Sequence, residues 1–393
     1  MGILIAYWVQ YGTLGISGNG AWRLCFALQL LPGAAVGAFM FYRPESPRWL
    51  LQSGREDEAE RVLARLHGNG DLDNALVRTE LNEIRMVVEL ESSTNSPSYW
   101  TLLSNEDYRR RTWLAVGAQM MQQLSGGNIV LYYAAKVFAQ TGQNGPTATM
   151  LANGINSAVV LVGTVSLTIM IDYYGRRKPI FIGPICMATC LIIVASIMVS
   201  FGSPHFNETT QAIEFNFANH SAGKAALAFI FLFQFFFGAL SSAIPWTYQS
   251  EIFPLVARAR GTSLSTSMNY MTNFWLGLYM PQALNTASWK VYFIFGGINL
   301  ACAVLGYLFY PETCGRTLEE LDLLFTPDRK TFVFLDRDAS KRRRFTQREI
   351  LSNDPIEAAE ILRERLFIGR NVNSSGENVK EYGASHLEKR GSK

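Results

Sequence analysis

Residues 122–133 read QQLSGGNIVLYY. They lie in a run from Thr112 to Ala135 that carries no charge and is longer than the roughly 20 residues that a helix needs to cross a bilayer. The stretch nevertheless holds two glutamines, an asparagine and two tyrosines, and such groups cost free energy in hydrocarbon unless they face something polar. It therefore predicts a membrane-spanning helix with a polar face.

Ser125, Gly126 and Gly127 separate the amides and form a weak point, because glycine is conformationally permissive and a poor helix former. In an unbroken helix Gln122 and Asn128 are about 120° apart, and a break at the glycines brings both amides to one side. Uncharged amides and hydroxyls at bilayer depth suit a ligand made of hydroxyl groups, such as a sugar. The alternative is hydrogen bonding between helices alone, worth roughly 0.6–2 kcal/mol per contact.

Apolar runs almost free of charge recur up to Tyr310. Apolar residues make up 49% of the 393 residues and charged residues 17%, below the usual ~25%, because the charges are concentrated in a few stretches. The runs predict eight membrane spans. They cover residues 2–16, 24–42, 112–139, 147–171, 180–201, 225–250, 261–282 and 291–310.

The segments outside these runs are polar. Residues 43–111 alternate charged with aliphatic side chains at helical spacing, which predicts amphipathic helices outside the bilayer. The predicted organisation is two spans in 1–42, an intracellular helical domain in 43–111, a six-helix transmembrane bundle in 112–310 and a cytoplasmic tail in 311–393.

Lysine and arginine cluster in alternate connections between the spans. The basic connections are 43–111, 172–179 and 251–260, and the others are 140–146 and 202–224. The positive-inside rule places the basic connections and both termini in the cytoplasm. Two glycosylation sequons, at Asn207 and Asn219, fall in a connection assigned to the outside, which supports this orientation.

Short motifs at the basic ends of the spans combine carboxylates with arginines. They are PESPR at 44–48, DYYGRR at 172–177, EIFP at 251–254, RARG at 258–261 and PETCGRTLEE at 311–320. Partly shielded ion pairs that sum to a few kcal/mol are enough to bias two conformations. Simple anchoring by positive charge is the alternative, and it accounts for the arginines but not for the carboxylates.

Together and in this order, the motifs resemble those of the sugar porter family of the major facilitator superfamily, over about residues 2–325. The N-terminal GILIAYW resembles the family's fifth transmembrane helix, and the last six spans resemble helices seven to twelve. The first four helices are therefore expected to be missing from an N-terminally truncated member. The resemblance implies an all-α integral membrane fold, an incomplete major facilitator-type bundle of eight transmembrane helices plus cytoplasmic helices.

The resemblance also implies residue roles. The sugar-contacting positions are Gln122, Gln123, Asn128, Asn156, Phe237, Trp246, Asn269 and Asn273, with Tyr132 and Tyr133 at an outer gate. The inner salt-bridge positions are Glu45, Asp172, Arg176, Glu251 and Arg258, with Arg48 and Arg177 beside them in the same motifs. Independently of the resemblance, Asn269 and Asn273 share a helix face because they are four residues apart.

A sugar carrier that works by alternating access is the function that the resemblance implies. Tyr7, Tyr173 and Gly238 depart from the pattern of glucose facilitators and favour the fungal-type branch, whose substrates include hexoses, disaccharides and other polyols. No carboxylate or histidine lies mid-span, so the acceptor of a proton-coupled form is expected in the missing helices. A non-transporting membrane sugar sensor with a signalling tail is the alternative.

Other classes of function find no support. The sequence contains no Ser/His/Asp set, no phosphate-binding loop and no metal-ligand spacing, and its five cysteines lie mostly in apolar runs. The net charge of +3 is too small to indicate nucleic acid. We therefore expect no enzyme activity, no cofactor and no metal, with a sugar and the lipid bilayer as partners and the plasma membrane as the location.

Overall fold

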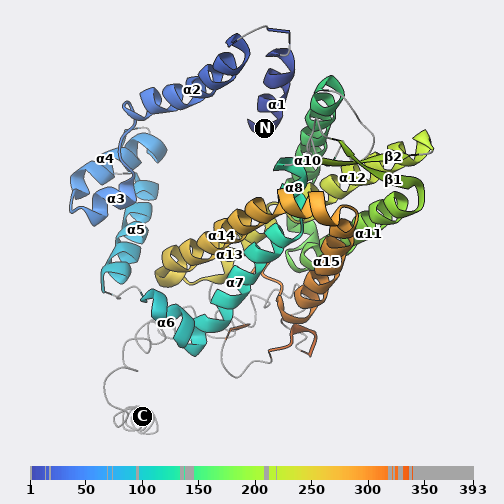
Figure 1. Ribbon diagram of the computed structural model, residues 1–393. Coiled ribbons are helices and arrows are strands. Elements are labelled where there is room, and N and C mark those ends of the chain that lie inside the picture. The colour runs from blue at the N-terminus through green and yellow to red at the C-terminus, as the bar shows by residue number, and fades with distance from the viewer. Residues whose placement is uncertain are drawn as a thin grey trace, which may run out of the picture. The chain divides into compact units, whose positions relative to one another are not determined.

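Each of the eight apolar runs contains a helix (Figure 1). The computed structural model describes residues 2–339 except 14, 17–18, 69, 73, 94–96, 133–136, 138–145, 208–211, 218, 317–320, 322–323, 326–330 and 336–338. The helices of the runs are α1 (Gly2–Thr13), α2 (Gly20–Met40), α7 (Glu106–Leu124), α8 (Gly127–Tyr132), α10 (Pro146–Tyr174), α11 (Arg177–Phe201), α12 (His220–Leu240), α13 (Ile244–Ile252), α14 (Leu255–Ala287) and α15 (Lys290–Phe309).

Two units divide the chain, Met1–Arg342 and Arg343–Lys393. The second unit lies outside the described residues, and so does most of the predicted tail. The domain divisions expected after residues 42, 111 and 310 stay predictions.

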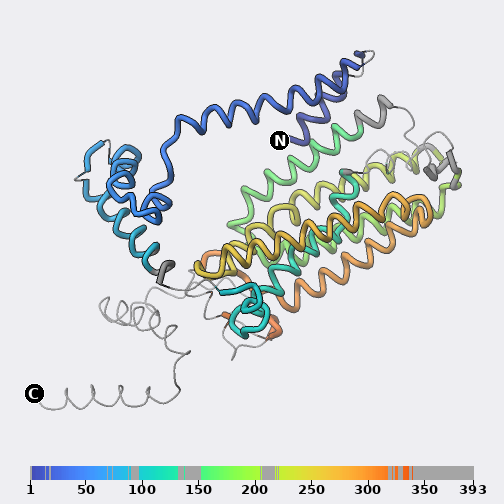
Figure 2. Tube along the Cα trace, turned by 60° about the vertical axis from the view of Figure 1, so that its left-hand side comes forward, coloured from blue at the N-terminus to red at the C-terminus, as the bar shows by residue number. Residues whose placement is uncertain are grey.

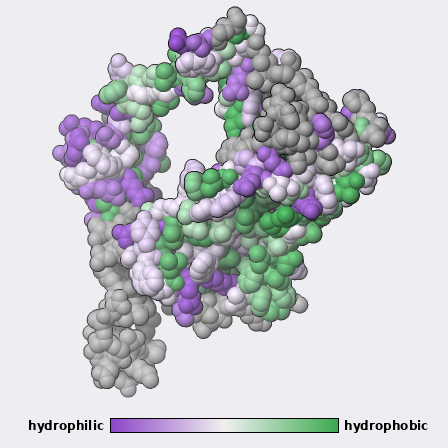
Figure 3. Space-filling model, viewed as in Figure 1, coloured by the Kyte–Doolittle hydropathy of each residue, from purple (hydrophilic) through white to green (hydrophobic). Residues whose placement is uncertain are grey.

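Five helical segments in the described part are long and apolar enough to cross a membrane. They are α2, Ala152–Tyr174 of α10, α11, Ser221–Ile252 and α15. Figure 3 shows hydrophobic residues over the surface of α15, where Ile294, Leu300 and Val304 are exposed. In contrast, α7 and α14 carry the amides discussed below, so a polar face lowers their average hydropathy.

Two of the spans are interrupted. Helix α7 ends at Leu124 and α8 begins at Gly127, with Gly126 between them at a φ of +87°. This left-handed backbone favours glycine, and the predicted break at the glycines is confirmed. The second interruption separates α12 from α13, where Pro245 occupies the first turn of α13 and has no N–H to leave unpaired.

The larger hydrophobic core lies among α8, α11, α12 and α15, together with the start of α10 and the last part of α14. Helix α11 packs against α15 and α12, α10 against α12, and α7 against α14 (Figure 2). Met187, Leu191, Ile230, Phe233 and Phe295 are buried at its centre. Burial of such side chains contributes roughly 1.5–3 kcal/mol each in water, and within a bilayer their close packing supplies the specificity.

A second core lies among α7, α13 and the segment that follows α15. Tyr248 and Tyr310 are fully buried there with their ring centroids 5.5 Å apart, and the Tyr310 hydroxyl donates to the Leu114 carbonyl at 2.9 Å. The segment that follows α15 folds back, since the Glu312 N–H donates to the Ala339 carbonyl at 2.9 Å. The ends of α7, α13 and α15 are thereby held together.

The described part of residues 43–104 contains four helices, and the amphipathic pattern predicts helices here. Ser46 caps the first of them by accepting a hydrogen bond from the Trp49 N–H at 3.2 Å. Leu50, Leu63 and Val77 form part of a small core of their own. The helices are α3 (Pro47–Gln52), α4 (Glu56–His67), α5 (Ala75–Ser93) and α6 (Tyr99–Ser104).

The connection 202–224 is expected as a loop, yet it contains a β-hairpin. Strands β1 (Gly202–Asn207) and β2 (Ala212–Phe217) pair antiparallel with Gly202 opposite Phe217. The hairpin follows α11 directly, and Phe217 packs against the larger core. In β2, Ile213, Phe215 and Phe217 alternate with polar residues at the spacing of a strand, whereas β1, which contains Pro204, carries no such pattern.

Candidate functional site

Gln123 is the centre of a cluster of amides contributed by α7, α8 and α14. Its Nε2 donates to Asn269 Oδ1 at 2.8 Å. Its Oε1 accepts from Asn128 Nδ2 at 2.9 Å and from Asn273 Nδ2 at 3.0 Å. The break at Gly126 makes this possible, because it turns Asn128 back toward α7. Two residues of α14 that share a face complete the cluster.

Asn269 extends this cluster to the rest of α7. Its Nδ2 lies 2.7 Å from Gln119 Oε1 and 2.9 Å from Gln122 Oε1. Gln122 Nε2 in turn donates to the Ser242 carbonyl, in the break between α12 and α13. Both interrupted spans therefore meet at one polar centre. We call Gln119, Gln122, Gln123, Asn128, Asn269 and Asn273 the amide cluster.

The members of the amide cluster differ in how deeply they are buried. Gln122, Gln123 and Asn269 are 7%, 4% and 2% exposed, whereas Asn128 and Asn273 are half-buried. The two half-buried amides donate to the same oxygen of Gln123. Amide N–H and carbonyl groups are of the kind that bond the hydroxyl groups of a solute. The cluster thus consists of uncharged donors and acceptors, with Asn128 and Asn273 its more exposed members.

Buried contacts hold the break itself in place. Asn299 Nδ2 of α15 donates to the Ser125 carbonyl at 2.9 Å, and the Ser125 hydroxyl donates to the Gln122 carbonyl at 2.6 Å. These bonds satisfy carbonyl groups that the interrupted helix leaves unpaired. The ring of Phe295 lies against Gly126, and a Cβ there would stand 3.2 Å from it.

Other residues predicted to contact sugar are not hydrogen-bonded to the amide cluster in the described part of the chain. Asn156 on α10 is 1% exposed, and its Oδ1 has no hydrogen-bond partner. Phe237 is 3% exposed and packs against Gly127, where a Cβ would overlap its ring. Trp246 on α13 is 39% exposed. The side chain of Tyr132 and all of Tyr133 lie outside the described residues.

A cluster of charges lies where α10, α11, α13 and the segment after α15 meet. Arg176 contacts Glu251 Oε1 through Nη2 at 2.9 Å and Asp172 Oδ1 through Nη1 at 3.1 Å. The same Nη1 lies 2.8 Å from the sulfur of Cys314. The Thr313 hydroxyl donates to the second oxygen of Glu251 at 2.6 Å. One guanidinium therefore joins three separate elements.

Glu312 occupies the N-terminus of α11 in the same place. It is 4% exposed and accepts backbone N–H bonds from Arg176 at 2.8 Å, Arg177 at 3.1 Å and Cys314 at 3.0 Å. A carboxylate at this helix end is favoured by the helix dipole. Gly175 has a φ of +80°, and a Cβ there would overlap the Glu312 carboxylate, so this turn requires glycine.

The electrostatics keep Arg176 charged. Burial acts to lower the pKa of its guanidinium, but Glu251, Cys314 and Asp172 together outweigh burial and raise the pKa above its ordinary value. We call Asp172, Arg176, Glu251, Glu312, Thr313 and Cys314 the charged cluster. No salt-bridge position was assigned to Glu312, Thr313 or Cys314 from the sequence. The PETCGRTLEE motif that contains them was the available signal.

The side chains of the remaining predicted ion-pairing residues make other contacts. Arg177 Nη2 donates to the Tyr307 carbonyl at 3.0 Å, and Arg258 Nε donates to the Phe253 carbonyl at 3.3 Å. Arg48 and Glu45 are exposed near α3, and the pKa of Arg55 is raised by its hydrogen bond to Glu58 and, to a smaller extent, by Glu45. Arg177 therefore connects α11 to α15, and Arg258 connects the first turn of α14 to the end of α13.

A sequence profile of the family described as "Sugar (and other) transporter" matches residues 1–325. The chain belongs to the sugar transporter family. This confirms the resemblance drawn from the motifs. The family and the relatives below are membrane transporters rather than enzymes, and the fold of this member is the helical membrane fold that the motifs imply.

Two curated fungal relatives illustrate the match. The chain is 35% identical over 329 residues to a high-affinity glucose transporter of Kluyveromyces lactis, covering 83% of this chain and 59% of that protein. It is also 35% identical over 336 residues to the glucose transporter mfs1 of Aspergillus flavus, covering 82% of this chain and 63% of that protein. The chain thus spans about three fifths of the length of these relatives.

A solved structure supports the fold. The proton:xylose symporter XylE bound to 6-bromo-6-deoxy-D-glucose matches with a TM-score of 0.62 at 24% identity, covering 82% of this chain and 64% of XylE. At this identity the likeness concerns the fold alone. The chain is accordingly a multi-span membrane protein of the major facilitator fold.

Proposed function

We propose that this chain binds a sugar at the amide cluster, as part of a transmembrane carrier that works by alternating access. The observation that carries the proposal is the convergence of four uncharged amides from α7, α8 and α14 on Gln123 and Asn269, which bond each other. Neutral amides at bilayer depth can replace the water shell of a polyhydroxylated solute without the cost of burying a charge. The names of the fungal relatives support a hexose.

In this proposal the half-buried Asn128 and Asn273 bond the sugar hydroxyls directly, and Gln122, Gln123 and Asn269 orient them. Trp246 stacks its ring on the C–H face of the sugar. Asn156 and Phe237 line the same space from α10 and α12, and Tyr132 and Tyr133 form an outer gate. The unpaired Oδ1 of Asn156 supports a role in bonding solute, because buried polar atoms normally find a partner.

The charged cluster serves as the inner gate. Arg176 links α10 to α13 and to the segment after α15, so a state in which these elements separate must break its ion pairs. Partly shielded pairs of this kind, summed over the cluster, supply the few kcal/mol that bias one conformation over another. Glu45, Arg48, Arg177 and Arg258 act in the same gate when the helices outside the bilayer approach it.

The proposed location is the plasma membrane, with the charged cluster and both termini in the cytoplasm. The Lys/Arg asymmetry of the connections supports this orientation. Asn207 and Asn219 then face the outside and carry N-linked glycans. A shift to lower mass after glycosidase treatment, lost in the Asn207→Gln, Asn219→Gln double variant, tests both statements. An unchanged mass contradicts them.

Binding and transport are tested separately. Titration of the purified chain with glucose, fructose, xylose and maltose, followed by intrinsic fluorescence, is expected to show saturable binding that Asn273→Leu abolishes. Ser196→Ala is the matched control, because its hydroxyl bonds only the Ile192 carbonyl of its own helix. Absence of binding by any sugar of the panel contradicts the proposed site.

Transport is measured as uptake of labelled sugar by cells that lack their own carriers. The chain is expressed as given and as a chimera in which residues 1–325 replace the matching portion of the Kluyveromyces lactis transporter. Uptake by the chimera that depends on Asn273 supports the carrier. A chimera that binds sugar but never accumulates it favours a membrane sugar sensor instead.

A further inference from the structure

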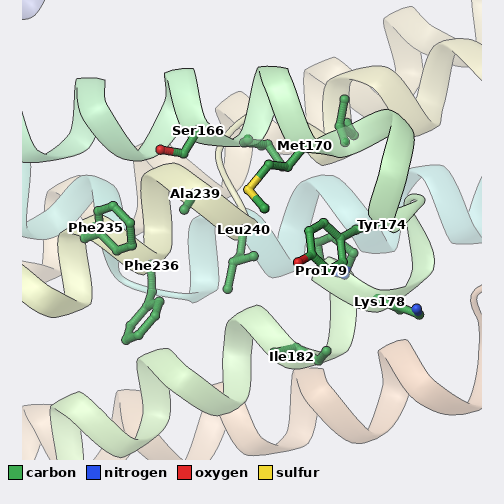
Figure 4. A pocket seen from close by; sticks show the side chains of 12 residues that line it. Ser166, Met170, Tyr174, Lys178, Pro179, Ile182, Phe235, Phe236, Ala239 and Leu240 are labelled. Carbon is green, nitrogen blue, oxygen red and sulfur yellow. The ribbon is translucent and has the colours of Figure 1, made fainter.

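An apolar groove lies between α10 and α11 on the surface of the bundle, with residues of α12 at its floor (Figure 4). Its volume is about 310 Å³, at the lower end of the ~300–1,000 Å³ range of ligand pockets. No residue of the amide cluster or the charged cluster lines it. The hydrophobic lining includes Leu167, Met170, Ile171, Ile182, Phe236 and Leu240.

Polar groups are found mainly at one end of the groove. Figure 4 shows Tyr174, Pro179 and Lys178 at that end and Phe235 and Phe236 at the opposite end. Lys178 is exposed in the first turn of α11. The groove therefore combines a long apolar surface with one cation at its mouth.

Glycine contacts make the groove a fixed feature of the backbone. A Cβ on Gly163 of α10 would stand 2.6 Å from the Phe235 carbonyl oxygen of α12. A Cβ on Gly183 of α11 would stand 2.9 Å from Leu240 Cβ of α12. Helices α10 and α11 are thus each packed closely against α12, and the groove between α10 and α11 stays open.

The length and position of the groove suit a lipid chain. Ser166 and Tyr174 are eight residues apart on α10, about 12 Å of helix rise, against about 15 Å for one leaflet of the hydrocarbon core. Helix α1 contacts α10 far from this point, where a Cβ on Gly154 would stand 3.4 Å from the ring of Trp8. An apolar groove on membrane-spanning helices suits an acyl chain, because lipid tails are as apolar as the side chains that line it.

We propose that this groove binds one acyl chain of an anionic phospholipid, with Lys178 pairing with the headgroup phosphate. Tyr174 then lies at the level of the headgroups, where aromatic residues with a polar tip are favoured. The positive charge at the mouth selects an anionic headgroup over a zwitterionic one. The orientation given by the basic connection 172–179 places this site in the cytoplasmic leaflet, which is the anionic one.

The site is tested by native mass spectrometry of the delipidated full chain in detergent. Dioleoyl phosphatidylglycerol is titrated in competition with dioleoyl phosphatidylcholine. We expect one phosphatidylglycerol to be retained preferentially, and Lys178→Gln to lower its affinity about fivefold, the factor for one basic residue at an anionic surface. Lys224→Gln, at the start of α12, is the matched control and is expected to change nothing. Equal retention of the two lipids overturns the proposal.

Filling the groove gives a second test. Met170→Trp is expected to abolish the preferential binding, whereas Ile169→Trp leaves it intact, because Ile169 is 66% exposed on the same helix and does not line the groove. Equal effects of the two substitutions overturn the proposal. Both variants are compared by thermal unfolding, so that a folding defect is separated from loss of lipid.

Two further outcomes distinguish other occupants. Glycerol 3-phosphate at matched concentration is expected not to displace the lipid, and displacement would show that the headgroup alone binds. Light scattering of the Met170→Trp protein is expected to match the parent chain. Loss of a dimer in that variant would assign the groove to a second copy of this chain and exclude the lipid.

Discussion

In both the amide cluster and the charged cluster, one polar side chain that is largely shielded from solvent joins several elements of the fold. Gln123 connects α7, α8 and α14 through uncharged hydrogen bonds. Arg176 connects α10, α13 and the segment after α15 through ion pairs. The first set can be exchanged bond for bond with a neutral solute, whereas the second resists exchange because a separated charge must be solvated.

Each cluster depends on a glycine with a left-handed backbone, Gly126 in the first case and Gly175 in the second. At Gly126 the positive φ breaks a span, and at Gly175 it closes a turn around the Glu312 carboxylate. The comparison teaches that in both places polar side chains converge because the backbone departs from a regular helix. Spacing within one helix is not sufficient.

Removal of the Arg176 guanidinium is expected to have the largest effect on the free energy of unfolding. Arg176→Met leaves Glu251 and Asp172 without their partner, and we expect a loss of about 3 kcal/mol in the free energy of unfolding. Chemical denaturation in detergent measures it. Arg109→Met is the matched control, because Arg109 is 51% exposed and pairs with Glu106 at 3.5 Å, and it is expected to cost less than about 0.5 kcal/mol. Equal losses in the two variants would show that the ion pairs of the charged cluster stabilise the fold no more than an exposed ion pair does.

Gln123→Leu is the corresponding change in the amide cluster. It removes the acceptor of two asparagines and the donor to Asn269, and we expect a loss of about 2 kcal/mol, smaller than at Arg176 because no charge is left unpaired. The same denaturation experiment measures the stability, and fluorescence titration measures the loss of sugar binding. Retained stability together with lost binding would make the cluster purely a binding site.

Substitution of alanine for Gly126 and for Gly175 compares the cost in stability of the two left-handed backbone positions. Gly126→Ala is expected to cost about 1 kcal/mol for the left-handed conformation, and Gly175→Ala more, because its Cβ also overlaps Glu312. Gly37→Ala on α2, with open space around it, is the control and is expected to be neutral or slightly stabilising. A smaller effect at Gly175 than at Gly126 would be evidence against the carboxylate contact.

A double-mutant cycle tests whether the clusters are independent. Arg176→Met and Gln123→Leu share no hydrogen-bond partner in the described residues, so their effects on unfolding are expected to add within about 0.5 kcal/mol. A larger coupling energy in unfolding would mean that the two clusters form one network. Repeating the cycle with sugar present shows whether solute creates the coupling.

The pH dependence is expected to give the smallest effect. Amides do not titrate, and the raised pKa of Arg176 keeps the charged cluster's cation protonated throughout. Sugar affinity of the purified chain is therefore expected to change less than about twofold between about pH 5 and 9. A steep dependence measured by the same titration would place an ionisable group in contact with the sugar.

Much of this architecture follows from local sequence. The eight apolar runs predict their helices, the glycines predict the break after Leu124, and the PETCGRTLEE motif points to the end of the bundle where Glu312 is found. The hairpin at 202–217 is different, because β1 with Pro204 has no strand pattern of its own and its extended conformation depends on pairing with β2. Gln119 also could not be assigned from local sequence. It lies in an apolar run, and only the tertiary structure shows that its Oε1 accepts a hydrogen bond from Asn269.

The sequence by itself determined the class of molecule, since runs of apolar residues long enough to span a bilayer leave the backbone no alternative to the helix. It also determined which polar residues had to be explained, because an amide in such a run requires a partner. Only the tertiary structure decided the partners: Gln123 bonds Asn269 and Asn273 across 146 and 150 residues. A hydrogen bond depends on where two helices cross, and helix packing sets that crossing over the whole bundle.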